Sequence, residues 1–391
     1  MKKVLISFLG KKPGGKSYQE TDYEFSPGDT EKTSFFGLAL ARRIQPQLLV
    51  VLGTVGSMWD VLAEYLLGES LSEAEALDLI EKADRNGITQ AQLDRLAPRV
   101  EQTLGIACRL RIIPFGRDQK EQVEILRAMS EHVESGDEVN MDLTHGLRHL
   151  PMLGLLSSLY LREARKAVVA GIFYGAFDLR NFQEDGGCVT PVLRLEGLLR
   201  VADWVRALAV FDHATDYSVF APLLQQEGLK NNLHEAAFFE RIFNPEKARQ
   251  KLTGFNLAEL KEKTIGGLFA EDIESRIDWF KKSARSEQEK ELARTYLEKR
   301  DYVRAVTYGF EALATALVEK KRGNICDFAE RSDRIKEACN QDKEIKQFSY
   351  LRNELVHGSR SRNSRVRKLV DNEHELNAYL KKFFGRYLPN S

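Results

Sequence analysis

The sequence lacks clustered cysteines and any long apolar run. Its four cysteines are far apart, at Cys108, Cys188, Cys326 and Cys339, which disfavours a disulfide framework or a cysteine-rich zinc site. No apolar run approaches the roughly 20 residues that a membrane span needs. A strand pattern begins within three residues of the start, so we expect no signal peptide and no membrane partner. A cytoplasmic protein with reduced thiols is the expectation.

The sequence also lacks a net charge. Its 58 Lys and Arg residues balance 58 Asp and Glu residues among 391 in total. Global charge therefore does not indicate a nucleic-acid partner, and any basic site must be local. The length suffices for two or three domains, each with its own core.

The first half of the chain alternates short apolar runs with amphipathic stretches. Strands are expected at 3–10, 47–54, 107–116, 137–146 and 166–177. Helices are expected at 31–44, 58–67, 71–83, 88–104, 118–135 and 147–164. This alternation predicts an α/β, Rossmann-like parallel sheet with helices on both faces. Ligands of such sheets bind beyond the carboxyl ends of the strands.

From about residue 196 the pattern is helical almost to the end of the chain. The expected domains are an α/β domain at 1–195, a helical linker region at 196–290 and an all-α domain at 291–391. The stretch 291–321 predicts a long helix or a helical hairpin. A later helix is expected to end at Gly358, a residue type that favours helix C-termini.

The loop after the first strand contains a string that fits a phosphate-binding loop. Gly10, Gly15, Lys16 and Ser17 have the spacing G-x-x-x-x-G-K-S. A P-loop NTPase needs a helix directly after this string, because the helix N-terminus binds the phosphates. Residues 18–28 show no helical periodicity and end in a Pro-Gly pair, which favours an edge strand or hairpin. The lysines predict a basic flap instead.

Two motifs follow the second and fourth expected strands, "GTVGSMWD" at 53–60 and "MDLTHGLRHLP" at 141–151. A Thr144 hydroxyl, the Gly146 backbone and an Arg148 guanidinium that opens a helix are suited to hold a phosphodiester without a metal. A turn with an incidental arginine is an equal alternative for the second motif alone. Its two histidines lack a third ligand and do not predict a metal site.

Both motifs closely resemble those of CARF domains, the Rossmann-like sensors of CRISPR-associated proteins. The resemblance covers roughly residues 1–195. It implies a cyclic oligoadenylate across the axis of a homodimer, with cyclic tetra-adenylate as the expected ring, and no cofactor. Whether the domain also degrades its ligand stays open. The expected ligand contacts, with one flap lysine included, are Gly10, Lys11, Thr54, Gly56, Ser57, Thr144, His145, Gly146 and Arg148.

The helix near the C-terminus contains "RNELVHG", with Arg352, Asn353 and His357. It resembles the R-x(4–6)-H motif of HEPN ribonucleases, and the resemblance to that all-α domain covers roughly 290–391. Five residues place the arginine and histidine about 140° apart and about 7.5 Å along an ideal helix. One helix does not easily aim both at one phosphate, whereas two facing copies can. The spacing therefore predicts a homodimer or a higher oligomer of dimers.

The HEPN resemblance implies metal-independent cleavage of single-stranded RNA by attack of its own 2′-hydroxyl, so DNA is expected to be inert. His357 is the expected general base or acid. Arg352 would stabilise charge on the phosphoryl oxygens, and Asn353 would orient the arginine or the RNA. A basic tract, otherwise a solvated helix face, is expected to bind the RNA backbone through Arg360, Arg362, Arg365, Arg367 and Lys368.

The sequence thus predicts an endoribonuclease of type III CRISPR defence that a cyclic oligoadenylate activates. A second interpretation is a ligand-responsive regulatory module whose HEPN half is inactive. The third is the P-loop NTPase, and a dehydrogenase is disfavoured because no G-x-G-x-x-G opens a helix after a strand. The retained pair of Arg352 and His357 favours the first interpretation.

Overall fold

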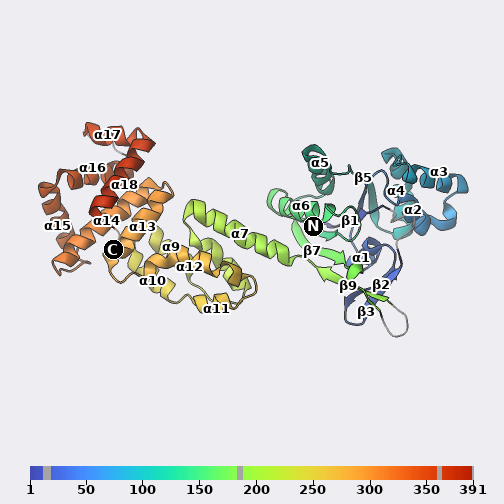
Figure 1. The fold of residues 1–391 in the computed structure, drawn as a ribbon, viewed down its shortest axis with the longest axis horizontal. Helices are drawn as coiled ribbons and strands as arrows, with labels where there is room; N and C mark the ends of the chain where they lie inside the picture. Colours follow the sequence, from blue (N-terminus) through green and yellow to red (C-terminus); the bar gives the residue numbers. More distant parts are fainter. Residues whose placement is uncertain (12–18, 183–187, 359–362, 390–391) are drawn as a thin grey trace. The chain divides into compact units, whose positions relative to one another are not determined.

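The computed structural model describes residues 1–11, 19–182, 188–358 and 363–389. The chain divides into two compact units, Met1–Leu199 and Arg200–Ser391 (Figure 1). Strands alternate with helices in the first unit, and the described part of the second unit is helical throughout. No helix in the described ranges is both long and apolar enough to cross a membrane. The expected order, an α/β sheet followed by an all-helical region, is confirmed.

The first unit is built on one mixed sheet, with nine strands among the described residues. Their order is β3-β2-β9-β7-β6-β1-β4-β5, and β8 pairs with β9 beside this path. The strands are β1 (Lys3–Leu9), β2 (Thr21–Ser26), β3 (Asp29–Thr33), β4 (Leu48–Gly53), β5 (Ala107–Ile112), β6 (Glu138–Asp142), β7 (Val168–Gly175), β8 (Asn181–Phe182) and β9 (Cys188–Arg194).

The five strands expected from apolar runs are all present, as β1, β4, β5, β6 and β7, and neighbours among them pair in parallel. Strand β1 lies at the centre of these five, between β4 and β6. The chain builds β4 and β5 on one side of β1 and then returns to build β6 and β7 on the other. Since connections diverge at such a point, the carboxyl end of β1 is the expected ligand crevice.

The helices of the first unit cover both faces of the sheet, because alternate residues of a strand point to opposite faces. On β1, Leu5 and Leu9 belong to a cluster with residues of α1 to α4, whereas Ile6 and Phe8 belong to a cluster with residues of α5 and α6. These helices are α1 (Phe36–Ile44), α2 (Trp59–Leu67), α3 (Glu73–Asp84), α4 (Gln90–Leu104), α5 (Gln119–Ser130) and α6 (Leu150–Ala164).

The segment after the first loop forms the expected hairpin. Strands β2 and β3 pair antiparallel, and Gly28 turns between them with a left-handed φ of 77°. The helix expected at 31–44 begins late, at Phe36, because residues 29–33 pair with β2. Strand β9 was not expected, since Pro191 and polar residues interrupt its pattern. Its extended conformation is stabilised by pairing with β2 and β7, because its own sequence lacks a strand pattern.

The second unit buries a single large cluster of apolar side chains. The cluster includes Trp204, Trp279, Tyr308 and Phe384, so it draws on both sides of the boundary expected at 290/291. That boundary stays a prediction. The helices are α7 (Gly197–Ala214), in which the division between the units falls, α8 (Ala221–Gln226), α9 (Leu233–Arg241), α10 (Pro245–Thr253), α11 (Leu257–Lys261), α12 (Ala270–Ile277), α13 (Arg285–Glu298), α14 (Tyr302–Lys320), α15 (Phe328–Gln341), α16 (Lys343–His357), α17 (Ser364–Val370) and α18 (Glu373–Tyr387).

Two sequence predictions for the helical unit are confirmed in detail. The stretch 291–321 forms most of a helical hairpin, with α13 and α14 separated by a break in which Arg300 has a left-handed φ of 58°. Helix α16 ends at Gly358, whose φ is 62° and whose N–H donates to the carbonyl of Glu354 at 2.9 Å.

Candidate functional site

The loop after β4 is fastened to the end of β1 by the Ser57 hydroxyl. Ser57 Oγ donates to the carbonyl of Leu9 at 2.7 Å and accepts the N–H of Thr54 at 2.9 Å. The N–H of Met58 donates to the carbonyl of Gly10, also at 2.9 Å. Thr54 and Ser57 are both buried. Their hydroxyls therefore shape the loop, and their direct contact with a ligand stays a prediction.

Asn86 completes this side of the site, and the sequence reasoning missed it. A Cβ atom on Gly56 would lie 2.0 Å from Asn86 Oδ1, so only glycine fits there without a shift of the amide. Lys11 Nζ donates to the same oxygen at 3.4 Å. Asn86 has a left-handed φ of 53° in the turn between α3 and α4. The Asn-Gly pair at 86–87 is a turn signal that could have pointed to this residue.

A buried carboxylate holds the loop after β6. Asp142 Oδ2 accepts the Ser7 hydroxyl at 2.7 Å, and Oδ1 accepts the N–H of Thr144 at 2.8 Å. Burial raises the pKa of the Asp142 carboxyl above its ordinary value. Thr144 Oγ1 in turn accepts the N–H of Gly175 at 2.8 Å. Polar contacts thus join the ends of β1, β6 and β7.

The loop that Asp142 holds presents some predicted residues to solvent and encloses others. His145 lines a cavity of about 20 Å³ against β1 and α1, and burial lowers the pKa of its imidazole to about 4. Gly146 has a φ of 118° and is exposed, as is Arg148. Helix α6 begins only at Leu150, so Arg148 precedes the helix by two residues and does not open it as expected.

The structure brings the two predicted loops together at the end of β1. Ser57 bonds to Leu9 on one side, and a Cβ atom on Gly146 would lie 3.4 Å from Phe8 Cβ on the other. Lys11, which follows β1, and Arg148, in the loop after β6, are both exposed. The edge therefore combines backbone groups of glycine-rich loops with two cations, a combination suited to phosphate oxygens. Gly15, Lys16 and Ser17 of the P-loop string lie outside the described residues.

The predicted catalytic residues lie on one continuous helix, α16. Arg352 Nη1 donates to Asn353 Oδ1 at 3.0 Å, and the guanidinium carbon lies 5.1 Å from the centroid of the Phe310 ring on α14. The Nε atom of Arg352 is enclosed, with no hydrogen-bond acceptor among the described residues. His357 is exposed in the last turn.

The predicted RNA-binding tract is described only in part. Arg360 and Arg362 lie outside the described residues. Arg365, Arg367 and Lys368 lie on α17 and are exposed, and Arg365 Nη1 donates to Glu344 Oε1 at 3.2 Å. In the described ranges, no three His, Cys, Asp or Glu side chains are grouped so as to hold a metal ion.

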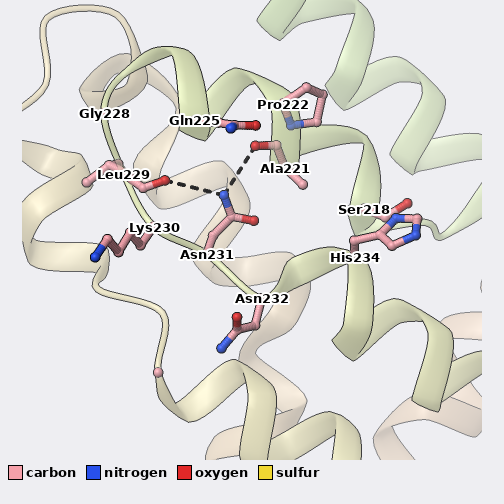
Figure 2. A pocket seen from close by; sticks show the side chains of 11 residues that line it. Ser218, Ala221, Pro222, Gln225, Gly228, Leu229, Lys230, Asn231, Asn232 and His234 are labelled. Carbon is pink, nitrogen blue, oxygen red and sulfur yellow. Dashed lines mark hydrogen bonds between the residues drawn. The ribbon is translucent and has the colours of Figure 1, made fainter.

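A polar cleft of about 760 Å³ also lies in the helical unit (Figure 2). Its walls include Gln225, Asn231 and His234. Asn231 Nδ2 donates to the carbonyls of Ala221 and Leu229, at 3.2 and 3.5 Å. This amide is thus committed to the fold of its own loop, and the cleft does not contain the predicted catalytic residues.

The fold and the strand-end loops define a Rossmann-like α/β domain, and comparisons with known proteins narrow this class further. Residues 4–178 match the family described as CRISPR system endoribonuclease Csx1, CARF domain. CRISPR-associated protein MJ1674 of Methanocaldococcus jannaschii is 25% identical over 253 residues, which are 58% of this chain and 39% of that protein. The chain thus spans well under half of that relative's length. Together these findings support a CRISPR-associated CARF protein.

Proposed function

We propose that the protein is a cyclic-oligoadenylate-activated, metal-independent endoribonuclease that cleaves single-stranded RNA in type III CRISPR defence. The CARF match supports the sensing half. The observation that carries the nuclease half is the presence of Arg352, Asn353 and His357 on one helix, α16, where Asn353 Oδ1 and the Phe310 ring contact the guanidinium. A guanidinium held in this way is suited to bind a phosphoryl oxygen of RNA through its charged N–H groups.

In this proposal a homodimer completes the sensor. Met152 and Leu156 lie one turn apart on α6, and their side chains are 75% and 54% exposed. Two large, exposed apolar side chains on the same face of a helix are typical of a contact surface. A parallel pairing of this face with its copy would bring the two Arg148 side chains to one end of the paired helices. Symmetric cations suit a cyclic, symmetric polyphosphate.

The proposed cleavage uses groups of the RNA and of this chain. The 2′-hydroxyl attacks the adjacent phosphorus, its proton leaves to a base, and the 5′-oxygen departs with a proton from an acid. His357 supplies one of these proton transfers. Arg352, steadied by Asn353 and the Phe310 ring, stabilises charge on the phosphoryl oxygens. Because the nucleophile belongs to the RNA, the chemistry requires no metal, and DNA is inert.

Activation requires that the ring bind the active arrangement more tightly than the inactive one, because a ligand with equal affinity for both shifts nothing. The test is RNA cleavage by the full chain against cyclic oligoadenylates of different sizes, with linear oligoadenylate as control. We expect one ring, the tetra-adenylate, to stimulate cleavage. His357→Ala should abolish cleavage with ring binding intact, whereas His374→Ala, an exposed histidine on α18, should cleave normally.

Two alternatives predict different results in the same assays. Ring binding without cleavage at any ring size would favour a regulatory module with an inactive HEPN half. Metal-dependent release of phosphate from ATP, lost in Lys16→Ala, would favour the P-loop NTPase. Equal cleavage by His357→Ala and the unaltered protein would remove the proposed catalytic assignment.

A further inference from the structure

A second cleft in the first unit is lined by cations and lies apart from the loops that follow β1, β4 and β6. It has a volume of about 840 Å³ and lies between the end of β5, helix α5 and the second half of α6. Arg111 comes from β5, Lys120 and Arg127 from α5, and Arg165 from the end of α6. Glu124 and Glu131 also line it, so the cations outnumber the acids in a chain of zero net charge.

Most of these cations are available to a ligand. The side chains of Lys120, Arg127 and Arg165 are exposed and form no ion pair within the described residues. Arg111 Nη2 lies 3.5 Å from Glu131 Oε2. By contrast Arg109, on the same strand as Arg111, is paired with Glu101 at 2.8 Å. Unpaired like charges gathered at one cleft favour a polyanionic ligand.

The spacing of two cations on α5 suits a chain of phosphates rather than a single one. Lys120 and Arg127 are seven residues apart, which places them about 10 Å apart along the helix and within about 20° of the same face. One compact anion does not span that distance. An extended phosphodiester backbone does, with successive phosphates along the cleft.

Tyr160 adds a surface for a base. Its side chain is 36% exposed and lines the cleft from α6, five residues before Arg165. Bases of single-stranded nucleic acids stack on exposed aromatic rings, whereas the bases of a duplex are already stacked. An acidic peptide would use the cations but would gain little from this ring.

We propose that this cleft, formed by Arg111, Lys120, Arg127, Tyr160 and Arg165, binds single-stranded RNA. The proposal goes beyond the proposed function, because it assigns RNA binding to the sensor unit, away from α16 and α17. It concerns binding and holds whether or not the bound RNA is cleaved there.

The test measures binding of a fluorescent single-stranded RNA of 12 nucleotides to the full chain with His357→Ala, so that cleavage does not remove the probe. Arg127→Ser with Arg165→Ser is compared with Lys82→Ser with Arg85→Ser. The second pair removes the same charge from the end of α3 and the residue after it, where both cations are paired with acids. We expect several-fold weaker binding for the cleft pair. The slope of log K against log salt concentration should also be smaller in magnitude by about 1.4, because each lost phosphate contact to a single strand contributes about 0.7 to it.

Substitutions of Tyr160 distinguish the binding of RNA from the binding of other polyanions. Tyr160→Ala should weaken RNA binding at least about fivefold, and Tyr160→Phe should bind as the parent does. Cyclic tetra-adenylate binding and thermal unfolding serve as folding controls. Equal RNA affinity and salt slope for the two charge pairs would overturn the proposal. The proposal would also be overturned if Tyr160→Ala kept the full affinity for RNA while Arg127→Ser with Arg165→Ser lost affinity for inorganic polyphosphate as strongly as for RNA.

Discussion

The hydroxyl of Ser7 on β1 lies 2.7 Å from Oδ2 of Asp142 at the end of β6, and the carboxylate that it bonds is fully buried. The two strands are neighbours in the sheet, and Ser7 pairs in register with Asp142. Gly37 on α1 leaves the room for this contact, because a Cβ atom there would lie 2.2 Å from Ser7 Oγ. The loop after β6 is therefore held by a polar contact inside the core of the first unit.

Ser7→Ala should lower the free energy of unfolding of the first unit by about 1–3 kcal/mol, because it removes a donor from a buried carboxylate. Ser158→Ala is the matched control. Ser158 is also buried, but its hydroxyl donates to the Gly154 carbonyl within α6 and contacts the Met141 sulfur. Hydrogen exchange of the β1 and β6 amides measures both variants. Equal protection in the two would contradict a special role for the Ser7 hydroxyl.

Stability of the second unit should depend on pH through Glu240. This carboxyl is 4% exposed and accepts the phenol of Tyr296, while its backbone carbonyl accepts the phenol of Tyr308. Burial raises the pKa of Glu240 from 4.5 to about 7. A folded pKa above the unfolded one gives stability that is fully present below pH 4.5 and is lost as pH rises through 7. The loss is about 3 kcal/mol.

Glu240→Gln should remove this pH dependence, so that urea unfolding of the variant changes less between pH 5 and 8 than that of the parent. Glu235→Gln, on the exposed side of the same helix, is the control and should keep the parent's dependence. A Glu240→Gln protein that still loses the same stability over this range would assign the effect to another group.

Leu156→Glu should weaken the proposed homodimer at least about tenfold, because it places a charge in an apolar contact that excludes water. Leu77→Glu on α3 is a matched control, since Leu77 is 67% exposed and lies on the other face of the sheet. Sedimentation equilibrium measures both dissociation constants. If Leu156→Glu and Leu77→Glu dimerise equally, α6 is not the contact.

Arg148→Ala should weaken binding of cyclic tetra-adenylate about 10-fold or more, the usual cost of losing a hydrogen bond to a charged group. Lys11→Ala should lower the affinity less, because Lys11 Nζ also donates to Asn86 Oδ1 at 3.4 Å. Arg85→Ala, an exposed residue directly after α3 that is paired with Glu81, controls for net charge. Isothermal titration calorimetry supplies the affinities. Equal losses for Arg148→Ala and Arg85→Ala would point to general electrostatics alone.

The parallel core of the sheet followed from the sequence because β1 and β4 are continuous apolar runs, the pattern of strands buried on both faces. Strand β5 instead alternates buried and exposed residues, the pattern of a strand with one solvated face. Strand β9 did not follow, since its order comes from partners distant in the sequence. The two motif loops were found from glycine, threonine and arginine in short strings. Asn86 was not, because its place beside Gly56 depends on how the turn after α3 packs. The cleft at Arg127 and Arg165 likewise gathers residues that the sequence keeps apart.

Helix α16 should depend on the planar guanidinium of Arg352 and not only on its charge. Arg352→Lys keeps the charge but loses the planar fork that bonds Asn353 and lies over Phe310. Single-turnover RNA cleavage with saturating activator should therefore fall about 100-fold or more, the usual range for a lost transition-state donor. The cleavage rate of Asn353→Ala should fall less, because this change only frees the guanidinium of Arg352 to move. Arg334→Lys, on the exposed side of α15 beside Glu337, should cleave normally. Full cleavage by Arg352→Lys would mean that a point charge suffices and that the planar fork of the guanidinium has no part in the reaction.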